Sequence, residues 1–165
     1  MFSNEFETIV EQNYEQLYRF ALSLTRTAAD ATELTQQTFH VWATKGHQLR
    51  DRSKVKTWLF TTLHRAFLES RQKQSQFSHQ RLDEIPLHAE SVCSPDLACE
   101  ADPAQLLGAL AQIQNTAAVA LFYLEDFSHQ SIAEILQVPV GTAKSHIARG
   151  TEKLREIFLR DSCFP

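Results

Sequence analysis

The stretch FSHQSIAEILQVPVGTAKSHIARGTEKLR, from Phe127 to Arg155, decides the fold. It contains two amphipathic helical patterns, separated by the short connection Gln137-Val138-Pro139, and Ser128 stands where a helix N-cap is expected. Pro139 falls about where the second helix begins, a place at which its missing N–H costs nothing. Two helices joined by so few residues predict a helix-turn-helix.

The second helix of this motif divides into two faces. The face expected in the core carries Val140, Ala143, Ile147, Leu154 and Phe158. The DNA-binding face is expected to carry Gly141, Thr142, Lys144, Ser145, His146, Arg149 and Lys153. Short polar groups near a recognition helix's start fit the major groove, cations further along reach phosphates, and free N–H groups at the first turn bind a phosphate oxygen. An ordinary solvated face is the alternative, and the tight turn favours DNA binding.

The rest of the chain also has helical periodicity, and only four Gly and five Pro occur in 165 residues. The pattern predicts an all-α protein of two small helical domains joined by a flexible linker. In residues 1–81 we expect helices over 4–25, over 28–45 with Thr27 as N-cap, and from a cap at Ser53 to near Lys73. Residues 82–103 carry three Pro and lack periodicity, so they are the predicted linker. Residues 104–165 add short helices near Leu106–Ile113 and Ala117–Leu124 before the helix-turn-helix.

Charge is distributed unevenly, although the net charge is only −4. Residues 44–81 hold nine basic and two acidic side chains, whereas residues 82–103 hold six acidic and no basic ones. A cluster of cations surrounds the predicted loop at residues 46–52 and consists of Lys45, Arg50, Arg52, Lys54 and Lys56. Such a cluster suits an anionic single strand, and His47 in the loop can stack on a base. A solvated surface is the alternative for any single residue.

Several classes of protein are disfavoured. The first ten residues have no apolar run and no signal-peptide pattern, and no apolar segment approaches the length of a membrane span, so we expect a cytoplasmic protein without membrane insertion. Cys93, Cys99 and Cys163 are too sparse for a disulfide framework. Cys93 and Cys99 lie near His88, but the spacing fits no zinc pattern. We expect no metal, no cofactor and no enzyme activity.

The segment from Ser128 to Arg155 resembles the promoter-binding C-terminal domain of bacterial sigma factors of the extracytoplasmic-function (ECF) group, in the sigma-70 superfamily. Their pattern is roughly S-x-x-E-I-A-E-x-L-x-[VI]-P-x-G-T-V-K-S-R-x-x-R-A-x-x-K-L-R. The matching residues are Ser128, Ile132, Ala133, Glu134, Leu136, Val138, Pro139, Gly141, Thr142, Lys144, Ser145, Arg149, Lys153, Leu154 and Arg155. Ser131, Ala143 and His146 depart from the pattern, and His146 lies on the expected DNA-facing side. The resemblance implies recognition of the minus-thirty-five element.

The N-terminal half resembles the same family. DATELTQQTFHVW, Asp30 to Trp42, is similar to the family's helix D-A-E-D-L-V-Q-E-x-F-x-x-x-W, which grips a coiled coil of the polymerase β′ subunit. By this resemblance the exposed polymerase contacts are Glu33, Gln36, Gln37 and His40. Leu34, Phe39 and Trp42 are expected in the core instead.

The loop and the third helix correspond to the family's minus-ten reader. The residues implied are Lys45, His47, Arg50, Arg52, Lys54, Lys56, His64 and Arg65, although the family often has Asn at position 65. Trp58 lies on the apolar stripe and is expected in the core. Phe60 lies off that stripe, and with Leu68 it forms an apolar pair on a basic face, which indicates a partner or DNA contact.

The resemblance implies a transcription initiation factor without catalytic activity. Its partners would be core RNA polymerase, through the β′ and β subunits, and promoter DNA. It also allows for an anti-sigma factor, which nothing in this sequence identifies. One alternative is a free-standing helix-turn-helix regulator, usually a dimer on paired half-sites. Another is a helical interaction protein or an enzyme that uses the linker's Cys and His residues.

Overall fold

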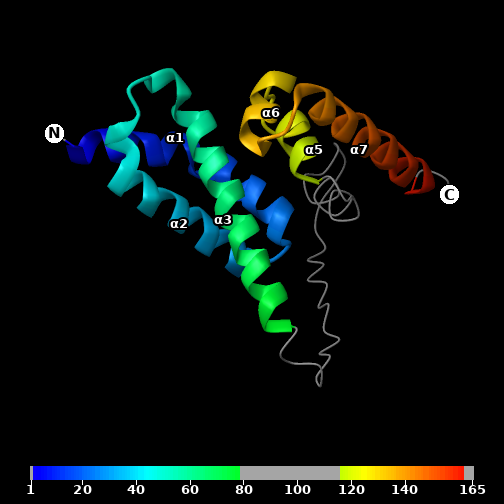
Figure 1. The fold of residues 1–165 in the computed structure, drawn as a ribbon, viewed down its shortest axis with the longest axis horizontal. Coiled ribbons are helices and arrows are strands. Elements are labelled where there is room, and N and C mark those ends of the chain that lie inside the picture. Colours follow the sequence, from blue (N-terminus) through cyan, green and yellow to red (C-terminus); the bar gives the residue numbers. More distant parts are fainter. Residues whose placement is uncertain (1, 79–115, 162–165) are drawn as a thin grey trace.

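The computed structural model describes residues 2–78 and 116–161, and every regular element in these ranges is helical. Helices α1 (Phe2–Thr25), α2 (Ala28–Lys45) and α3 (Val55–Ser78) form the N-terminal half. Helices α5 (Thr116–Tyr123), α6 (His129–Leu136) and α7 (Val140–Asp161) form the C-terminal half. Figure 1 shows α1, α2 and α3 packed as one bundle, with α5 to α7 beside the upper part of α3. The all-α prediction is confirmed for the described residues.

Helix α2 begins and ends where local signals predict. The backbone of Thr27 is extended and its side chain accepts a hydrogen bond from the N–H of Asp30, which satisfies a free donor in the first turn. Gly46 ends the helix, and its N–H donates to the carbonyl of Trp42. Both the predicted range and the predicted cap at Thr27 are confirmed.

The connection between α2 and α3 differs from the expected polar loop. It contains two short 3₁₀ turns, η1 (Gly46–Gln48) and η2 (Arg52–Lys54). The expected cap at Ser53 is wrong, because the capping group is the carboxylate of Asp51, which accepts hydrogen bonds from both the N–H and the hydroxyl of Ser53. These bonds hold the pKa of Asp51 below its usual value, the side-chain bond from Ser53 most strongly. These hydrogen bonds therefore restrict the conformation of the loop at Asp51 and Ser53.

The core of the N-terminal half joins all three of its helices. Leu17 and Phe20 of α1 are fully buried, as are Leu59 and Leu63 of α3. From α2, the buried side chains are Leu34, Phe39 and Trp42, as expected. Trp58 is half-buried and meets Trp42 edge to face, with ring centroids 5.1 Å apart. Each fully buried large apolar side chain stabilises the fold by about 1.5–3 kcal/mol.

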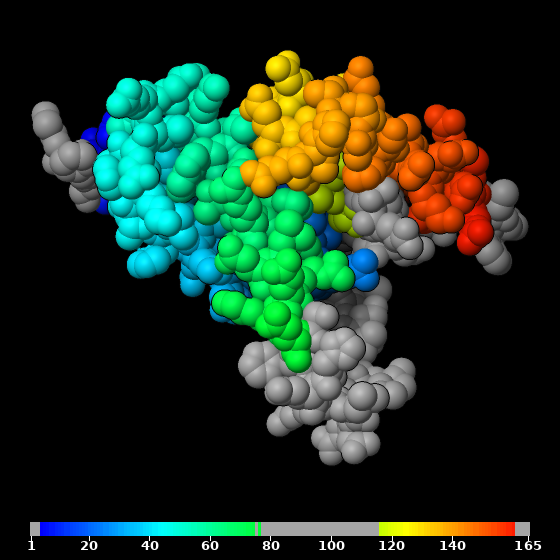
Figure 2. Space-filling view, viewed as in Figure 1, coloured from blue at the N-terminus to red at the C-terminus, as the bar shows by residue number. Residues whose placement is uncertain are grey.

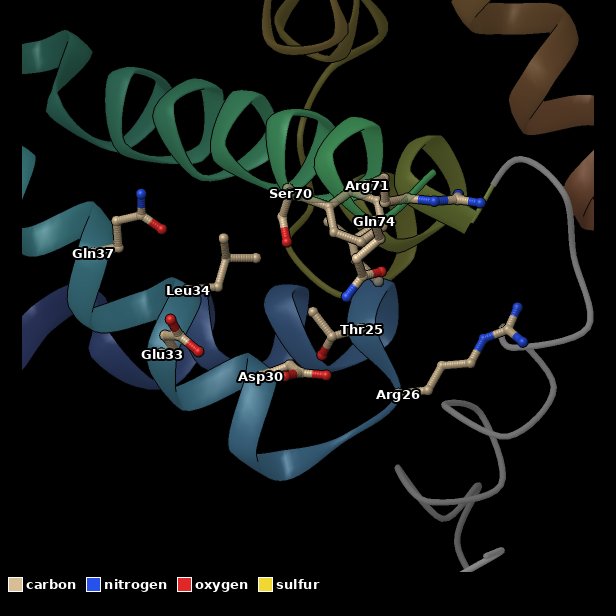
Figure 3. Close-up of a pocket in the computed structure, with 11 residues that line it drawn as sticks. Thr25, Arg26, Asp30, Glu33, Leu34, Gln37, Ser70, Arg71 and Gln74 are labelled. Atoms are coloured by element: carbon tan, nitrogen blue, oxygen red, sulfur yellow. The ribbon is translucent and has the colours of Figure 1, made fainter. Parts of the chain in front are cut away.

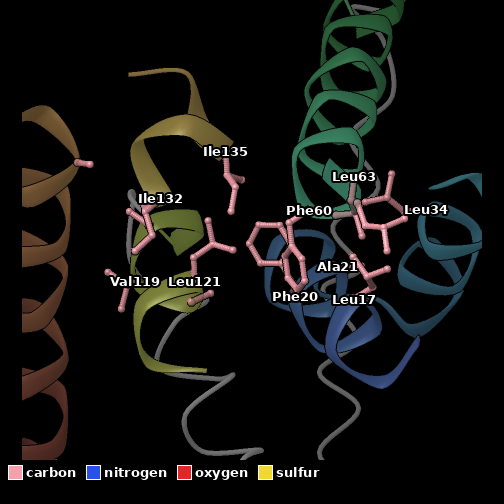
Figure 4. Packing of buried hydrophobic residues seen from close by; sticks show 14 of the residues in the cluster. Leu17, Phe20, Ala21, Leu34, Phe60, Leu63, Val119, Leu121, Ile132 and Ile135 are labelled. Atoms are coloured by element: carbon pink, nitrogen blue, oxygen red, sulfur yellow. The ribbon is translucent and has the colours of Figure 1, made fainter. Parts of the chain in front are cut away.

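The C-terminal half has its own buried stripe. Val119 and Leu121 of α5 and Ile132 and Ile135 of α6 are fully excluded from solvent, and α7 adds Ala143, Ile147 and Leu154. Figure 4 shows the two sets of apolar side chains on either side of the aromatic rings of Phe20 and Phe60. The two halves therefore share one continuous hydrophobic cluster. The linker expected over 82–103 and the helix expected near Leu106–Ile113 lie outside the described residues.

Candidate nucleic-acid interface

Helices α6 and α7 form the predicted helix-turn-helix. Ser128 caps α6 by accepting a hydrogen bond from the N–H of Ser131. Gln137 then adopts the left-handed conformation, with φ 56° and ψ 45°, and the N–H of Val138 bonds to the carbonyl of Ala133 at 3.1 Å. The N–H of Ala143 bonds to the carbonyl of Pro139 at 3.0 Å, and only three residues separate the two helices. This geometry fixes the direction of α7 relative to α6.

The polar face of α7 carries the residues expected to meet duplex DNA. Its exposed members are Gly141, Lys144, Ser145, Arg149 and Lys153, whereas Thr142 and His146 are half-buried. The hydroxyl of Ser145 donates to the carbonyl of Gly141 at 3.0 Å, which leaves its oxygen free to accept from a ligand. Lys153 pairs with Glu156 at 3.2 Å on the same helix, and exposed pairs of this kind are weak enough to exchange for a phosphate.

Val140 corrects the prediction for this helix. The apolar pattern places it in the core, but its side chain is 41% exposed. Val138, in the turn, packs against the hydrophobic cluster. Val140 is the first residue of α7, and its side chain lies beyond the part of the helix that neighbouring helices cover. An exposed apolar group at the start of a recognition helix can contact a thymine methyl, and periodicity alone gives no signal of it.

The predicted cation cluster surrounds the two 3₁₀ turns. Its exposed members are Lys45, Arg50, Arg52 and Lys54, and His47 beside them is also exposed. Arg52 bonds to the carboxylate of Glu5 on α1 at 3.1 Å, a partner that local sequence reasoning missed because it lies 47 positions away. A groove of about 540 Å³ opens next to this pair, and it is lined by Asn4, Gln12, Asn13, Arg52 and Lys56 among others. Amide and cationic side chains thus gather beside the basic loop.

Helix α3 carries the remaining minus-ten candidates, and the C-terminal half contacts one of them, Lys56. Lys56 is half-buried, with its Nζ 5.0 Å from the ring centroid of Phe127. His64 is also half-buried, and burial lowers its pKa. Arg65, one position further on, is exposed.

Phe60 corrects a second expectation. The sequence pattern places it with Leu68 on a surface open to a partner, but its side chain is fully buried, whereas Leu68 is 45% exposed. The ring of Phe60 lies 5.3 Å from that of Phe20 and 5.0 Å from that of Phe127, measured between centroids. The ring of Phe60 thus packs against Phe20 of its own half and against Phe127 of the other half. A local pattern cannot identify the second of these neighbours.

The four predicted polymerase contacts share one exposed side of α2. Glu33, Gln36, Gln37 and His40 are all open to solvent, and they alternate with buried Leu34, Thr35, Thr38 and Phe39. Figure 3 shows Glu33 and Gln37 at the edge of a cleft that Arg26 and Asp30 also line. Its other wall comes from Ser70, Arg71 and Gln74 of α3, and its volume is about 340 Å³. The lining is mainly polar, so a partner's polar side chain would fit there.

Other sequence-based expectations concern residues outside this surface. His88, Cys93, Cys99 and Cys163 lie outside the described residues, and so does Arg81 at the end of the basic segment. Within residues 2–78 and 116–161, no three His, Cys, Asp or Glu side chains gather as a metal ion would require. In the same ranges no helix has both the length and the apolarity needed to cross a bilayer.

A helix-turn-helix beside a helical bundle with a basic loop defines a two-part helical DNA-binding protein. Comparison with known families is more specific. The family described as "Sigma-70 region 2" matches residues 9–77, and "Sigma-70, region 4" matches residues 105–154. The chain belongs to the sigma-70 family of RNA polymerase sigma factors and to its ECF group. It is a transcription initiation factor that binds core RNA polymerase and directs it to promoters, and its family is not a class of enzymes.

Individual relatives agree with this assignment. The chain is 27% identical over 157 residues to the ECF RNA polymerase sigma factor SigM of Bacillus subtilis, an alignment that covers 93% of this chain and 95% of SigM. It is also 27% identical to the ECF RNA polymerase sigma factor SigE of Mycolicibacterium smegmatis, where 95% of this chain spans only 63% of the relative. The sigma factor RpoE of Bartonella quintana, solved in complex with the anti-sigma factor NepR, shares the fold with a TM-score of 0.75 and 24% identity, over 93% of this chain and 96% of that one.

Proposed function

We propose that the chain divides its work between residues 1–81, which bind core polymerase and the minus-ten element, and residues 104–165, which bind the minus-thirty-five element. Residues 82–103 would be the linker between them. The observation that carries this division is the separation of surfaces. The polymerase candidates lie on α2, the cation cluster lies around η1 and η2, and the recognition helix is α7.

Polymerase binding is assigned to Glu33, Gln36, Gln37 and His40, together with the cleft beside them. An amphipathic helix that exposes polar side chains at positions three and four apart offers a continuous strip to a partner's coiled coil. The cleft beside the first turns of α2 would accept one polar side chain from that coiled coil. Reversing the charge at one end of the strip should therefore weaken holoenzyme assembly without unfolding the bundle.

The test is assembly with bacterial core RNA polymerase on size exclusion. The Glu33→Arg, Gln36→Arg double variant should lose comigration, whereas Glu11→Arg, an exposed acidic position on α1, should assemble as the wild type does. Circular dichroism checks that each variant keeps its helices. Equal assembly of both variants would show that polymerase is held by another surface.

The minus-ten surface would consist of Lys45, His47, Arg50, Arg52, Lys54, Lys56, His64 and Arg65. A melted strand needs cations for its phosphates and pockets for its unstacked bases. The groove of about 540 Å³ beside Arg52 offers amide groups of Asn4, Gln12 and Asn13, which can bond to base edges. Arg52 would exchange its exposed pairing with Glu5 for a phosphate.

The minus-thirty-five surface would consist of Gly141, Thr142, Lys144, Ser145, His146, Arg149 and Lys153, with Val140 as an added apolar contact. Transcription in vitro can identify the promoters that this surface reads. The holoenzyme is used to transcribe sheared DNA of the source genome, and the 5′ ends are mapped. Start sites should share two spaced elements, and His146→Arg should change the base preference only in the upstream one. Start sites without shared upstream sequence would contradict this assignment of α7.

Three finer points belong to the same proposal. A protein that works on polymerase and the chromosome would act in the cytoplasm, and it would need no catalytic activity or cofactor of its own. The complex of the Bartonella relative with an anti-sigma factor supports a similar partner here. Purification of the tagged chain from its own cells, under non-inducing conditions, should recover such a protein in stoichiometric amount. Recovery of polymerase alone would count against it.

A further inference from the structure

The two halves of the chain meet through an aromatic contact. Phe60, on α3, is fully buried between Phe20 of its own half and Phe127 of the other. Figure 4 shows the rings of Phe20 and Phe60 facing the side chains of Leu121 and Ile135. Helix α1 contacts α5 as well, and α3 contacts α6. In the space-filling view of Figure 2, the surfaces of α3 and of α6 touch.

A poorly satisfied ion pair lies at the same contact. A guanidinium nitrogen of Arg19, on α1, is 3.6 Å from Oε1 of Glu125, whose side chain is 1% exposed. Within the described part of the chain, neither Nε of Arg19 nor Oε1 of Glu125 has a hydrogen-bond partner. A buried polar atom without such a partner costs roughly 1–3 kcal/mol, so the contact is far from optimal. It can therefore be broken by a competing ligand.

The contact covers part of the surface assigned to the minus-ten element. Nζ of Lys56 lies over the ring of Phe127, where a phosphate cannot approach it from that side. In contrast, Arg50 and Lys54 stay exposed. A single strand that follows the whole basic surface would have to displace the C-terminal half from α3.

We propose that the segment Glu125–Phe127, between α5 and α6, is an intramolecular latch that occupies the single-strand-binding face of α3 in the free chain and leaves it when that face binds DNA. The occupant is the chain's own C-terminal half, because Phe127 covers Phe60 and Glu125 is buried beside Arg19. The inference rests on the proposed minus-ten role of α3. The latch would make the free protein bind single strands weakly.

The latch also responds to pH. Burial raises the pKa of Glu125 to about 7, against the opposing effects of Arg19 on α1 and Lys56 on α3, while Asp126 and Glu15 add to the rise. The closed form therefore binds this proton more tightly than an open form with an ordinary carboxyl group. Closure is favoured at low pH and is progressively lost as pH rises through about 7. Burial lowers the pKa of His64 on α3, so His64 would act in the opposite direction if opening exposes it.

Closure can be measured by energy transfer in the full chain. Cys93, Cys99 and Cys163 are replaced by Ser, and dyes are attached through Glu69→Cys on α3 and Glu152→Cys on α7, both exposed. Phe127→Asn, which removes the aromatic contact without adding charge, should lower the transfer efficiency. Leu159→Asn removes a 61% exposed apolar group from the same half and should leave it unchanged. Unchanged transfer in Phe127→Asn with full helicity would overturn the latch.

Occlusion is measured with a fluorescein-labelled single-stranded 12-nucleotide probe and unlabelled dye-free protein. If the open form is about a tenth of the population, Phe127→Asn should bind the probe about tenfold more tightly than the wild type. Opening without any gain in affinity would overturn occlusion. Lys54→Ala, outside the covered face, tests the proposed minus-ten role separately. A loss of affinity there supports that role whether or not the latch exists.

A second variant covers the case in which Phe127→Asn fails to fold. Glu125→Gln keeps the shape of the side chain and removes its titration. Transfer in the wild type should fall between about pH 5.5 and pH 8.5, while transfer in Glu125→Gln should stay high over that range. Because His64 is present in both proteins, its contribution cancels in the comparison. Parallel curves for the two proteins would show that Glu125 does not control closure.

Discussion

Gly46 lies against the indole ring of Trp42 so closely that a Cβ atom added to it would come within 2.7 Å of Cδ2 of that ring. The backbone of Gly46 is ordinary, with φ −59° and ψ −28°, so glycine is needed here for space and not for conformation. Trp42 in turn meets Trp58 edge to face, which restricts movement of the indole. The junction between α2 and the basic loop therefore has no room for a side chain unless the indole ring shifts.

Gly46→Ala is expected to lower the free energy of unfolding by about 1–3 kcal/mol, because the crowded indole must shift. Gly141 is the matched control, since an added Cβ there would meet nothing within 4 Å. Gly141→Ala should stabilise α7 by up to about 1 kcal/mol through helix propensity. Urea unfolding followed by circular dichroism measures both. A Gly46→Ala protein as stable as the wild type would mean that the loop moves freely away from Trp42.

Gln137→Gly is expected to stabilise the C-terminal half. Gln137 is held at φ 56°, a left-handed conformation that costs a residue with a Cβ roughly 1–2 kcal/mol. Glycine adopts it freely, although part of the gain is lost to the greater entropy of the unfolded chain. A gain of about 1 kcal/mol in urea unfolding is expected. Gln130→Gly, in the exposed first turn of α6, should destabilise instead, and a loss at both sites would contradict this account of the turn.

Protonation of His64 should lower the stability of the free protein in acid. Burial lowers the pKa of His64 in the folded state, so the unfolded chain binds this proton more tightly. The contribution of neutral, buried His64 to the free energy of unfolding is fully present above the unfolded pKa of about 6.5. It is lost as pH falls below that value. Between pH 7.5 and pH 5.5, the unfolding free energy of His64→Gln should fall less, or rise more, than that of the wild type, because Glu125, which acts in the opposite direction, is present in both proteins. The same change of unfolding free energy with pH in both proteins would show that protonation of His64 does not lower the stability.

Arg149→Ala should reduce the salt dependence of promoter binding by the holoenzyme. Arg149 is exposed on the proposed DNA-facing side of α7, so it is expected to contact one phosphate. Loss of one phosphate contact lowers the slope of log K against log salt by about 1. Arg160→Ala, an exposed cation in the last turn of the same helix, serves as the control. Equal slopes for wild type and Arg149→Ala would remove this residue from the interface.

Much of the fold could be predicted because its signals are local. The cap at Thr27, the range of α2, the cap at Ser128 and the tight turn at Gln137 all depend on residues within a few positions of each other. The exposed strip on α2 was expected from the family resemblance, and it agrees with the helical period, since Leu34 and Phe39 are buried and the four strip positions are exposed.

The failures have a common physical cause. Ser53 lost its capping role to a carboxylate two positions earlier, and Val140 begins a helix beyond the reach of the packed stripe. Phe60 is covered by a residue 67 positions away, across residues 79–115. Periodicity describes one helix at a time, so it shows that Phe60 is apolar and off the stripe but cannot name the helix that covers it.

The shared cluster around Phe60 also limits how far this protein can be treated as two interchangeable parts. A hybrid that joins residues 1–81 to the promoter-reading half of a different sigma factor would bring a foreign surface against Phe20, Phe60 and Arg19. A hybrid whose new half lacks a counterpart of Phe127 would expose an aromatic ring and be prone to aggregation. Engineers who want new promoter specificity on this scaffold should keep Glu125 and Phe127 and exchange only the outer face of α7.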